Sequence, residues 1–280
     1  MNKDKAGKKP LKNMKRGMLA AAAVLVIGTS TTVAAAQNTD YFKMFFSVKE
    51  MGSQITDQVT IVSGIKMKVE ESMSGGKSAI IIASFEKEDG SLFPKDAAIA
   101  TLELDLKNGA SYMVDQQVTE DGKKLIAMFD VDSTSSLAGE KVTLRADAII
   151  NGETDEIVEE GPFKHTFKVQ DHSNRMDIDL TMKQQNEEVA LKTVYVSAIG
   201  IGLEGKRVDG KTDFLPEHAP IVKAIAKDNT IIELKSSSTS TTDIGFKWQY
   251  SLDQDGNRVF LEKSKIKAIM INDQLMNVNE

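Results

Sequence analysis

The chain has 280 residues, with 35 lysines and arginines, 41 aspartates and glutamates and no cysteine. The lack of cysteine excludes disulfides, thiol catalysis and cysteine-ligated metals. The formal net charge is −6, and the tail through Arg16 holds seven cations and one carboxylate, so the rest of the chain carries −12. Nucleic-acid binding requires clustered lysines and arginines, so no nucleic-acid partner is expected.

The first element is a basic tail, residues 1–17, followed by an uncharged segment from Met18 to Ala36. Basic residues beside an apolar segment stay on the cytoplasmic side of a membrane, so everything after Gln37 is expected outside the cytoplasm. A retained transmembrane helix needs about 20 apolar residues, and the run is long enough. A cleaved signal peptide needs small residues before the cut, which Ala34 to Ala36 supply. We therefore predict a single-pass membrane protein with extracellular C-terminal domains or, alternatively, a secreted protein cleaved after Ala36.

A short juxtamembrane helix is predicted from Asp40 to Met51. It carries three phenylalanines, Phe42, Phe45 and Phe46. Aromatic side chains at this position either pack on the domain that follows or lie at the lipid interface. The sequence leaves both alternatives open.

The rest of the chain has the apolar–polar alternation of half-buried strands. Examples are Ile65–Val69, Leu102–Leu106, Phe163–Val169, Met176–Met182 and Ile266–Ile271. Asp-Gly and Asn-Gly pairs suited to tight hairpins separate these runs, at positions 89–90, 108–109, 121–122, 151–152, 209–210 and 255–256. The pattern predicts an all-β protein with two tandem antiparallel β-sandwich domains of immunoglobulin-like type.

A boundary between these domains is predicted near Asn151 to Pro162, because this stretch is acidic and interrupts the alternation. The first domain then spans residues 40–160 and the second spans residues 161–280. The run Lys235 to Thr242 (KSSSTSTT) is low in complexity and is expected to be a loop or an exposed edge.

Several of these segments also carry a resemblance to a known family. They are Ile65–Phe85 with the following Glu88-Asp89-Gly90, Asp121–Phe129, Val194–Gly205 and Ile266–Asn272. With the basic tail and the membrane segment, they resemble an uncharacterised ectodomain family of Bacillus-type Firmicutes, often found behind anti-sigma-factor-like N-terminal regions. The resemblance covers roughly Asp40 to Glu280 and implies a retained anchor. That family has no assigned activity, so no catalytic residue is carried over.

The chain departs from the anti-sigma pattern in its N-terminal region. Only a short basic tail precedes Gly17, whereas binding a sigma factor requires a folded helical module. We therefore expect any link to anti-sigma-type signalling to run through a partner protein.

The glycine motif Gly200-Ile201-Gly202-Leu203-Glu204-Gly205 matches the dinucleotide fingerprint G-x-G-x-x-G. A dinucleotide site also needs a helix that opens at the glycines, and Lys206 to Pro216 is rich in turn residues instead. We interpret the motif as a β-bulge or a tight bend between strands.

Other candidate sites are weak. Asp253 to Asn257 with Glu262 lacks the glycine and glutamate spacing of a calcium loop, and Glu153 to Glu160 is interpreted as a solvated charge run. The three histidines, His165, His172 and His218, have no metal-site spacing. No catalytic, cofactor-binding or metal-binding residue is predicted.

Three aromatic residues, Phe246, Trp248 and Tyr250, alternate along one strand and so share one face. They are interpreted as core residues, with an exposed platform for sugar stacking as the alternative.

Three function classes follow. The favoured one is a non-enzymatic, membrane-anchored protein that senses or binds a ligand or protein partner in the cell envelope. The second is a secreted module for wall polymer or protein, released by cleavage at Ala36. The third is an exported hydrolase, which requires a concave cluster of aspartate, glutamate and histidine between the domains.

Overall fold

The structure is a computed structural model that describes residues 25–27, 41–46, 59–106, 109–184, 186–211, 214–242, 244–254 and 257–278. The basic tail and most of Met18 to Ala36 lie outside these residues, and Leu25–Ile27 forms a short strand, β1. Within the described ranges, no helix has the length and apolar character needed to cross a bilayer.

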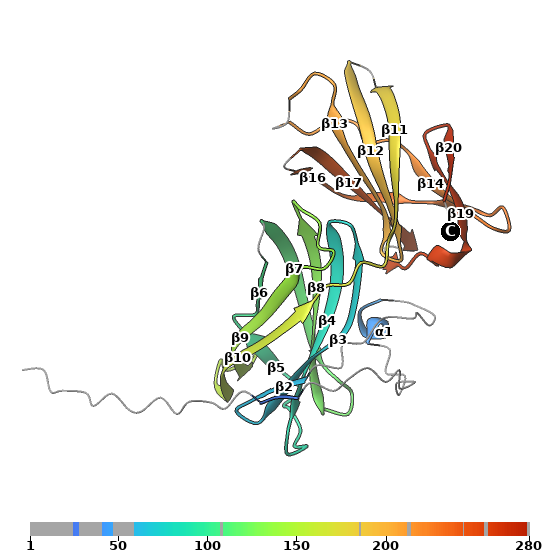
Figure 1. Cartoon of the computed structure of the whole chain (residues 1–280). Coiled ribbons are helices and arrows are strands. Elements are labelled where there is room, and N and C mark those ends of the chain that lie inside the picture. Colours follow the sequence, from blue (N-terminus) through green and yellow to red (C-terminus); the bar gives the residue numbers. More distant parts are fainter. Residues whose placement is uncertain are drawn as a thin grey trace, which may run out of the picture.

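The first half of the molecule consists of two antiparallel sheets (Figure 1). The strands are β2 (Val59–Val62), β3 (Ile65–Gly75), β4 (Ser78–Lys87), β5 (Ala97–Ala100), β6 (Glu103–Asp105), β7 (Ala110–Val118), β8 (Lys124–Ser133), β9 (Lys141–Asn151) and β10 (Ile157–Lys168). One sheet has the order β1-β2-β3-β4-β8-β7, and the other has the order β10-β9-β5 with β6 also paired to β9.

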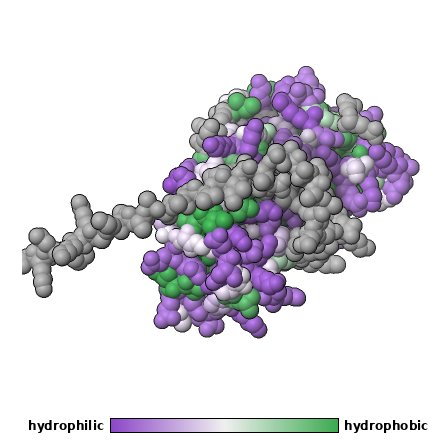
Figure 2. Space-filling view, turned by 60° about the horizontal axis from the view of Figure 1, so that its bottom comes forward, coloured by the Kyte–Doolittle hydropathy of each residue, from purple (hydrophilic) through white to green (hydrophobic). Residues whose placement is uncertain are grey.

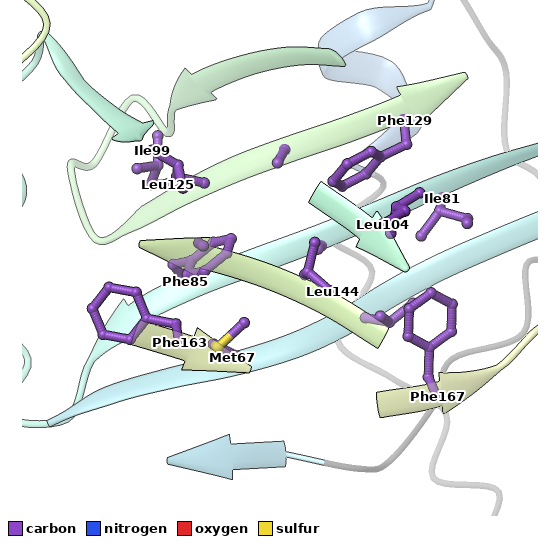
Figure 3. Packing of buried hydrophobic residues seen from close by; sticks show 14 of the residues in the cluster. Met67, Ile81, Phe85, Ile99, Leu104, Leu125, Phe129, Leu144, Phe163 and Phe167 are labelled. Atoms are coloured by element: carbon purple, nitrogen blue, oxygen red, sulfur yellow. The ribbon is translucent and has the colours of Figure 1, made fainter. Parts of the chain in front are cut away.

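The first apolar core lies between these two sheets, as Figure 3 shows. Met67, Phe85 and Phe129 come from the six-stranded sheet, and they meet Leu144 and Phe163 from the four-stranded one. Alternate residues of each strand enter this core, which is why the sequence alternates with a period of two.

The second half repeats this arrangement with two further antiparallel sheets. The strands are β11 (Asn174–Gln184), β12 (Glu187–Ser197), β13 (Gly200–Arg207), β14 (Val222–Ala226), β15 (Ile231–Glu233), β16 (Lys235–Thr242), β17 (Gly245–Gln254), β18 (Asn257–Val259), β19 (Ile266–Ile271) and β20 (Gln274–Asn277), with a 3₁₀ turn at Lys263–Lys265. The sheet orders are β11-β12-β13-β17-β16, with β18 also paired to β17, and β15-β14-β19-β20. A second core separates them.

The all-β prediction is confirmed, because antiparallel sheets account for nearly all of the regular secondary structure in the described chain. The run Lys235 to Thr242 forms β16, an edge strand, in agreement with the expected exposed edge. In the described part, the only α-helix is a single turn, α1 (Phe42–Phe45), which lies inside the predicted helix Asp40 to Met51; residues 40 and 47–51 of that prediction lie outside the described residues.

The segment Asn151 to Pro162 does not separate the two cores. It contains the turn between β9 and β10 and the first half of β10, and β10 pairs with β9 in the same sheet. Phe163, Phe167 and Val169, which the sequence assigned to the second domain, pack in the first core. The change from one core to the next falls in the non-strand residues 169–173. An acidic turn resembles a domain linker in sequence, because turns and linkers are both polar and exposed to solvent.

A third apolar cluster, the interface cluster, joins the two halves. It contains Ile80, Ile82 and Met128 from the first half and Ile199 and Phe260 from the second. Residues at α1 pack on it too: Met44, Phe45 and Phe46 are half-buried, and the Phe46 and Phe260 ring centroids are 4.8 Å apart. Of the two alternatives for these aromatics, packing on the protein is the one observed for Phe45 and Phe46.

The surface seen in Figure 2 is mainly hydrophilic, with apolar side chains in separate patches. This is the usual composition of an acidic, water-exposed protein surface.

Candidate functional site

The two halves meet through the outer faces of their larger sheets. Strand β17 places Phe246, Trp248 and Tyr250 in the second core, which confirms their interpretation as core residues. The opposite face of the same strand is also buried, and there it carries Lys247 and Gln249, which are 2% and 3% exposed. A polar face of a strand is thus buried between the halves.

Ion pairs connect the two halves across this boundary. The Arg258 Nη1 atom lies 2.6 Å from Asp130 Oδ2, and the ammonium of Lys247 contacts the Asp132 carboxylate. Lys247 Nζ also lies 3.2 Å from Ser78 Oγ. Each of these contacts joins β4 or β8 of the first half to β17 or β18 of the second. Every carboxylate named here therefore has a basic partner.

The tip of the β3–β4 hairpin fits closely against the second half. A Cβ placed on Gly76 would lie 2.9 Å from the Tyr195 ring, and Gly76 has a φ of +67°, which favours glycine. The adjacent Lys77 places its Nζ 3.5 Å from Glu204 Oε2 on β13. Glycine at this tip therefore allows the hairpin to approach the sheet of the other half.

A cavity of about 280 Å³ lies at this boundary, beside the ion pairs. Its walls come from both halves and include Ser111, Asp130, Asp132, Ser238, Gln249 and Arg258. We call it the inter-half cleft. A second cavity, of about 240 Å³, lies beside Glu204, Thr193 and Lys206 on the same sheet of the second half.

Burial controls the electrostatics of these groups. Burial lowers the pKa of Lys247 to about 7, with Lys77 acting in the same direction and Asp130 against it. Lys247 also contacts the Asp132 carboxylate, and such a contact favours the protonated ammonium. Burial raises the pKa of Glu204, and the nearby Lys77 opposes that rise.

The glycine motif, which was interpreted as a β-bulge or a tight bend between strands, lies in a strand directly after a tight turn. Gly200 to Arg207 is strand β13, which follows the β12–β13 turn, with a register shift opposite Gly205. A Cβ on Gly202 would lie 3.1 Å from Gln249 Oε1, so the absence of a side chain there leaves room for the Gln249 amide. The motif therefore shapes the wall of the inter-half cleft.

The histidines do not gather at the cleft. His165 is 2% exposed, with its Nδ1 atom 2.8 Å from Thr60 Oγ1, and burial lowers its pKa to about 4. The His172 carbonyl accepts a hydrogen bond from Lys263, and His218 is exposed. Among the residues that the structure describes, no group of three or more His, Asp or Glu could hold a metal ion.

The acidic candidates are structural or solvent-facing. Asp253 accepts a hydrogen bond from Lys235. Its backbone lies opposite Arg258 in the register of the β17–β18 hairpin, as expected for a turn rather than a calcium loop. Glu159 in the acidic run pairs with Lys87 at 2.6 Å. The hydrolase hypothesis requires a cluster of aspartate, glutamate and histidine between the domains. In the observed cleft, Asp130 and Asp132 each contact a basic side chain instead.

Sequence analysis did not identify the polar residues that lie between the two halves. Asp130, Asp132, Lys247 and Gln249 all alternate with core residues and read as the wet face of a strand. A polar face buried by another part of the chain has the same local pattern as one facing water. The available signal was the unusual FKWQY segment, whose polar members separate three large aromatics.

No known family profile matches the chain, and no curated protein matches it. A similar solved structure is described as the crystal structure of the conserved domain protein from Bacillus anthracis. It is 13% identical, has a TM-score of 0.47, and the match covers 81% of this chain and 92% of that one.

Proposed function

We propose that this chain is a non-enzymatic extracytoplasmic binding protein of the cell envelope. In this proposal two tandem immunoglobulin-like β-sandwich domains are held at the membrane by Met18 to Ala36. The basic tail before an uncharged segment supports export. Two apolar cores, each enclosed between two antiparallel sheets, support the tandem sandwich arrangement.

The observation that carries the binding role is the polar lining of the inter-half cleft. A concave site with a few convergent polar groups is the usual form of a ligand-binding site. Its carboxylates, Asp130 and Asp132, contact Arg258 and Lys247. Because each carboxylate is already paired with a basic side chain, the arrangement favours recognition through charge and hydrogen bonding.

A secreted form is the second candidate. The small residues Ala34 to Ala36 favour it, because signal peptidase cuts after such a sequence. The same cleft then serves a soluble wall-binding or protein-binding module.

The mature N-terminus, determined by mass spectrometry on membrane and medium fractions of the native host, tests this proposal. An intact N-terminus in the membrane fraction is the expected result. A start at Gln37 in the medium would replace the anchored form with the secreted one, and intact protein confined to the cytosol would contradict export. Deletion of Met18 to Ala36 provides the control, because it should abolish recovery from the membrane fraction.

A further inference from the structure

Strand β16 forms one edge of the larger sheet of the second half, at the margin of that half in Figure 1. Among the described strands it pairs with β17 alone, so one row of its backbone N–H and C=O groups points away from the sheet. Its pairing is regular from Ser238 to Thr242, after a register shift between Ser236 and Ser238. This regular part therefore offers an open backbone edge to a further strand.

The chemistry of β16 differs from that of the opposite edge of the same sheet. Natural sheets protect their edges from pairing with charged side chains, bulges or very short strands. At the opposite edge, β11 carries Arg175, Asp177 and Asp179, all of them exposed. In β16, every residue from Ser236 to Thr242 is serine or threonine, and the single charge, Lys235, lies at the first position. The regular part of β16 therefore lacks the charges that protect β11.

The composition of β16 favours a second copy of this chain as its partner. A foreign peptide that adds to a sheet edge obtains its specificity from alternate side chains that fit matching pockets or charges. A run of serine and threonine presents small hydroxyl groups at each position, and serine and threonine opposite one another form favourable cross-strand pairs. The β16 strand of a second copy supplies such a partner along its whole length.

An antiparallel register satisfies the symmetry of such a pair. A two-fold axis through Ser240 places Thr239 opposite Thr241 of the second copy and Ser238 opposite Thr242. Opposed residues then share a face of the sheet, as strand pairing requires. Thr239 and Thr241 are both exposed, so their side chains can meet those of the second copy.

The distribution of charge also favours this edge as the contact. The chain after Arg16 carries a net charge of −12, so two copies repel each other over most of their surface. The uncharged part of β16 brings the copies together with little direct repulsion. In the antiparallel register the two Lys235 side chains lie towards opposite ends of the shared ladder, and each contacts Asp253 of its own chain at 2.8 Å.

We propose that two copies of this chain associate by antiparallel pairing of their β16 strands, so that the larger sheet of the second half continues from one copy into the other. The pairing uses the same edge in both copies and leaves neither β16 edge open, which gives a closed dimer rather than a fibre. A single pair of strands buries a small area, so the dimer is weak. This inference goes beyond the proposed binding role and does not depend on the inter-half cleft.

The test is sedimentation velocity of the full chain, purified from whichever host fraction contains it, over about 1–300 μM, a range that covers weak association. One double variant, Thr239→Lys with Thr241→Lys, places lysines opposite lysines across the shared ladder. A second, with glutamate at both positions, does the same with negative charge. Thr181→Lys adds a lysine at an exposed threonine of β11 and is the control at the opposite edge of the sheet.

The parent chain and Thr181→Lys should form a dimer as concentration rises, and each double variant should weaken it at least about tenfold. An equimolar mixture of the two double variants should recover the dimer, because opposite charges then face each other. Circular dichroism checks folding, and if one double variant fails to fold, the other decides the test against the parent. A monomeric parent, a dimer that a folded double variant retains, or a mixture of folded double variants that stays monomeric would overturn the proposal.

Discussion

Strand β17 has two buried faces that differ completely in chemistry. Phe246, Trp248 and Tyr250 fill the apolar core of the second half, whereas Lys247 and Gln249 face the first half across ion pairs and a cavity. Apolar burial stabilises a fold in proportion to area, but a buried polar face stabilises little once desolvation is counted. The comparison teaches that one face of the strand holds the second half together, whereas the other face specifies how the two halves meet.

The largest expected effect is on the apolar face. Trp248→Ala removes a 1%-exposed side chain that packs 4.4 Å, centroid to centroid, from Phe246. We expect the free energy of unfolding to fall by about 3–5 kcal/mol, because a large cavity remains in the core. Urea denaturation followed by circular dichroism measures this loss. A change below about 1 kcal/mol would show that the second half does not depend on this core.

That core was predictable from sequence, and the reason is local. Alternation in FKWQY places its three aromatics on one face whatever lies on the other. The role of Lys247 and Gln249 depends on β4 and β8, more than one hundred residues earlier in the chain, and no local pattern records such a contact. The same limit explains the boundary: Phe163 and Phe167 alternate as strand residues, but only their pairing with β9 shows which core they enter.

The next effect concerns the polar face. Lys247→Met keeps most of the side-chain volume but leaves the Asp132 carboxylate without its ammonium partner. We expect a loss of about 2 kcal/mol, less than for a fully buried pair because the Asp132 side chain is 26% exposed. Adding Asp132→Asn should restore most of this loss, since the uncompensated charge is then removed.

Thermal and urea unfolding of both variants and the double variant form a double-mutant cycle. If the single and double variants are equally unstable, the ion pair supplies stability rather than specificity, and the contrast between the two faces of β17 weakens.

The buried side chain of His165 in the first half extends the comparison to a group that titrates. Burial lowers the pKa of His165 from 6.5 to about 4, so the unfolded chain binds more protons than the folded one between these values. The contribution of neutral His165 is therefore complete above about pH 6.5 and is lost as the pH falls towards 4. Unfolding free energy should be about 2 kcal/mol lower near pH 5 than near pH 8.

Urea titrations of the parent chain and of His165→Leu across this pH range measure the effect. The variant should lose this part of the slope whatever its absolute stability. Equal slopes in the two proteins would assign the pH dependence to other groups.

The smallest effect is expected from an exposed ion pair. Arg175 Nη2 lies 2.9 Å from Asp177 Oδ1 on β11, but these side chains are 60% and 76% exposed. Water and salt screen such a pair, so Arg175→Ala should change the unfolding free energy by less than about 0.5 kcal/mol, and added salt should reduce this difference further. The same 2.9 Å contact would have a much larger consequence if it were enclosed, because each ion would then lose its hydration. A loss above about 1 kcal/mol on urea unfolding would mean that Arg175 contributes through packing. Solvent exposure would then no longer explain why this ion pair stabilises the fold less than the Lys247–Asp132 pair.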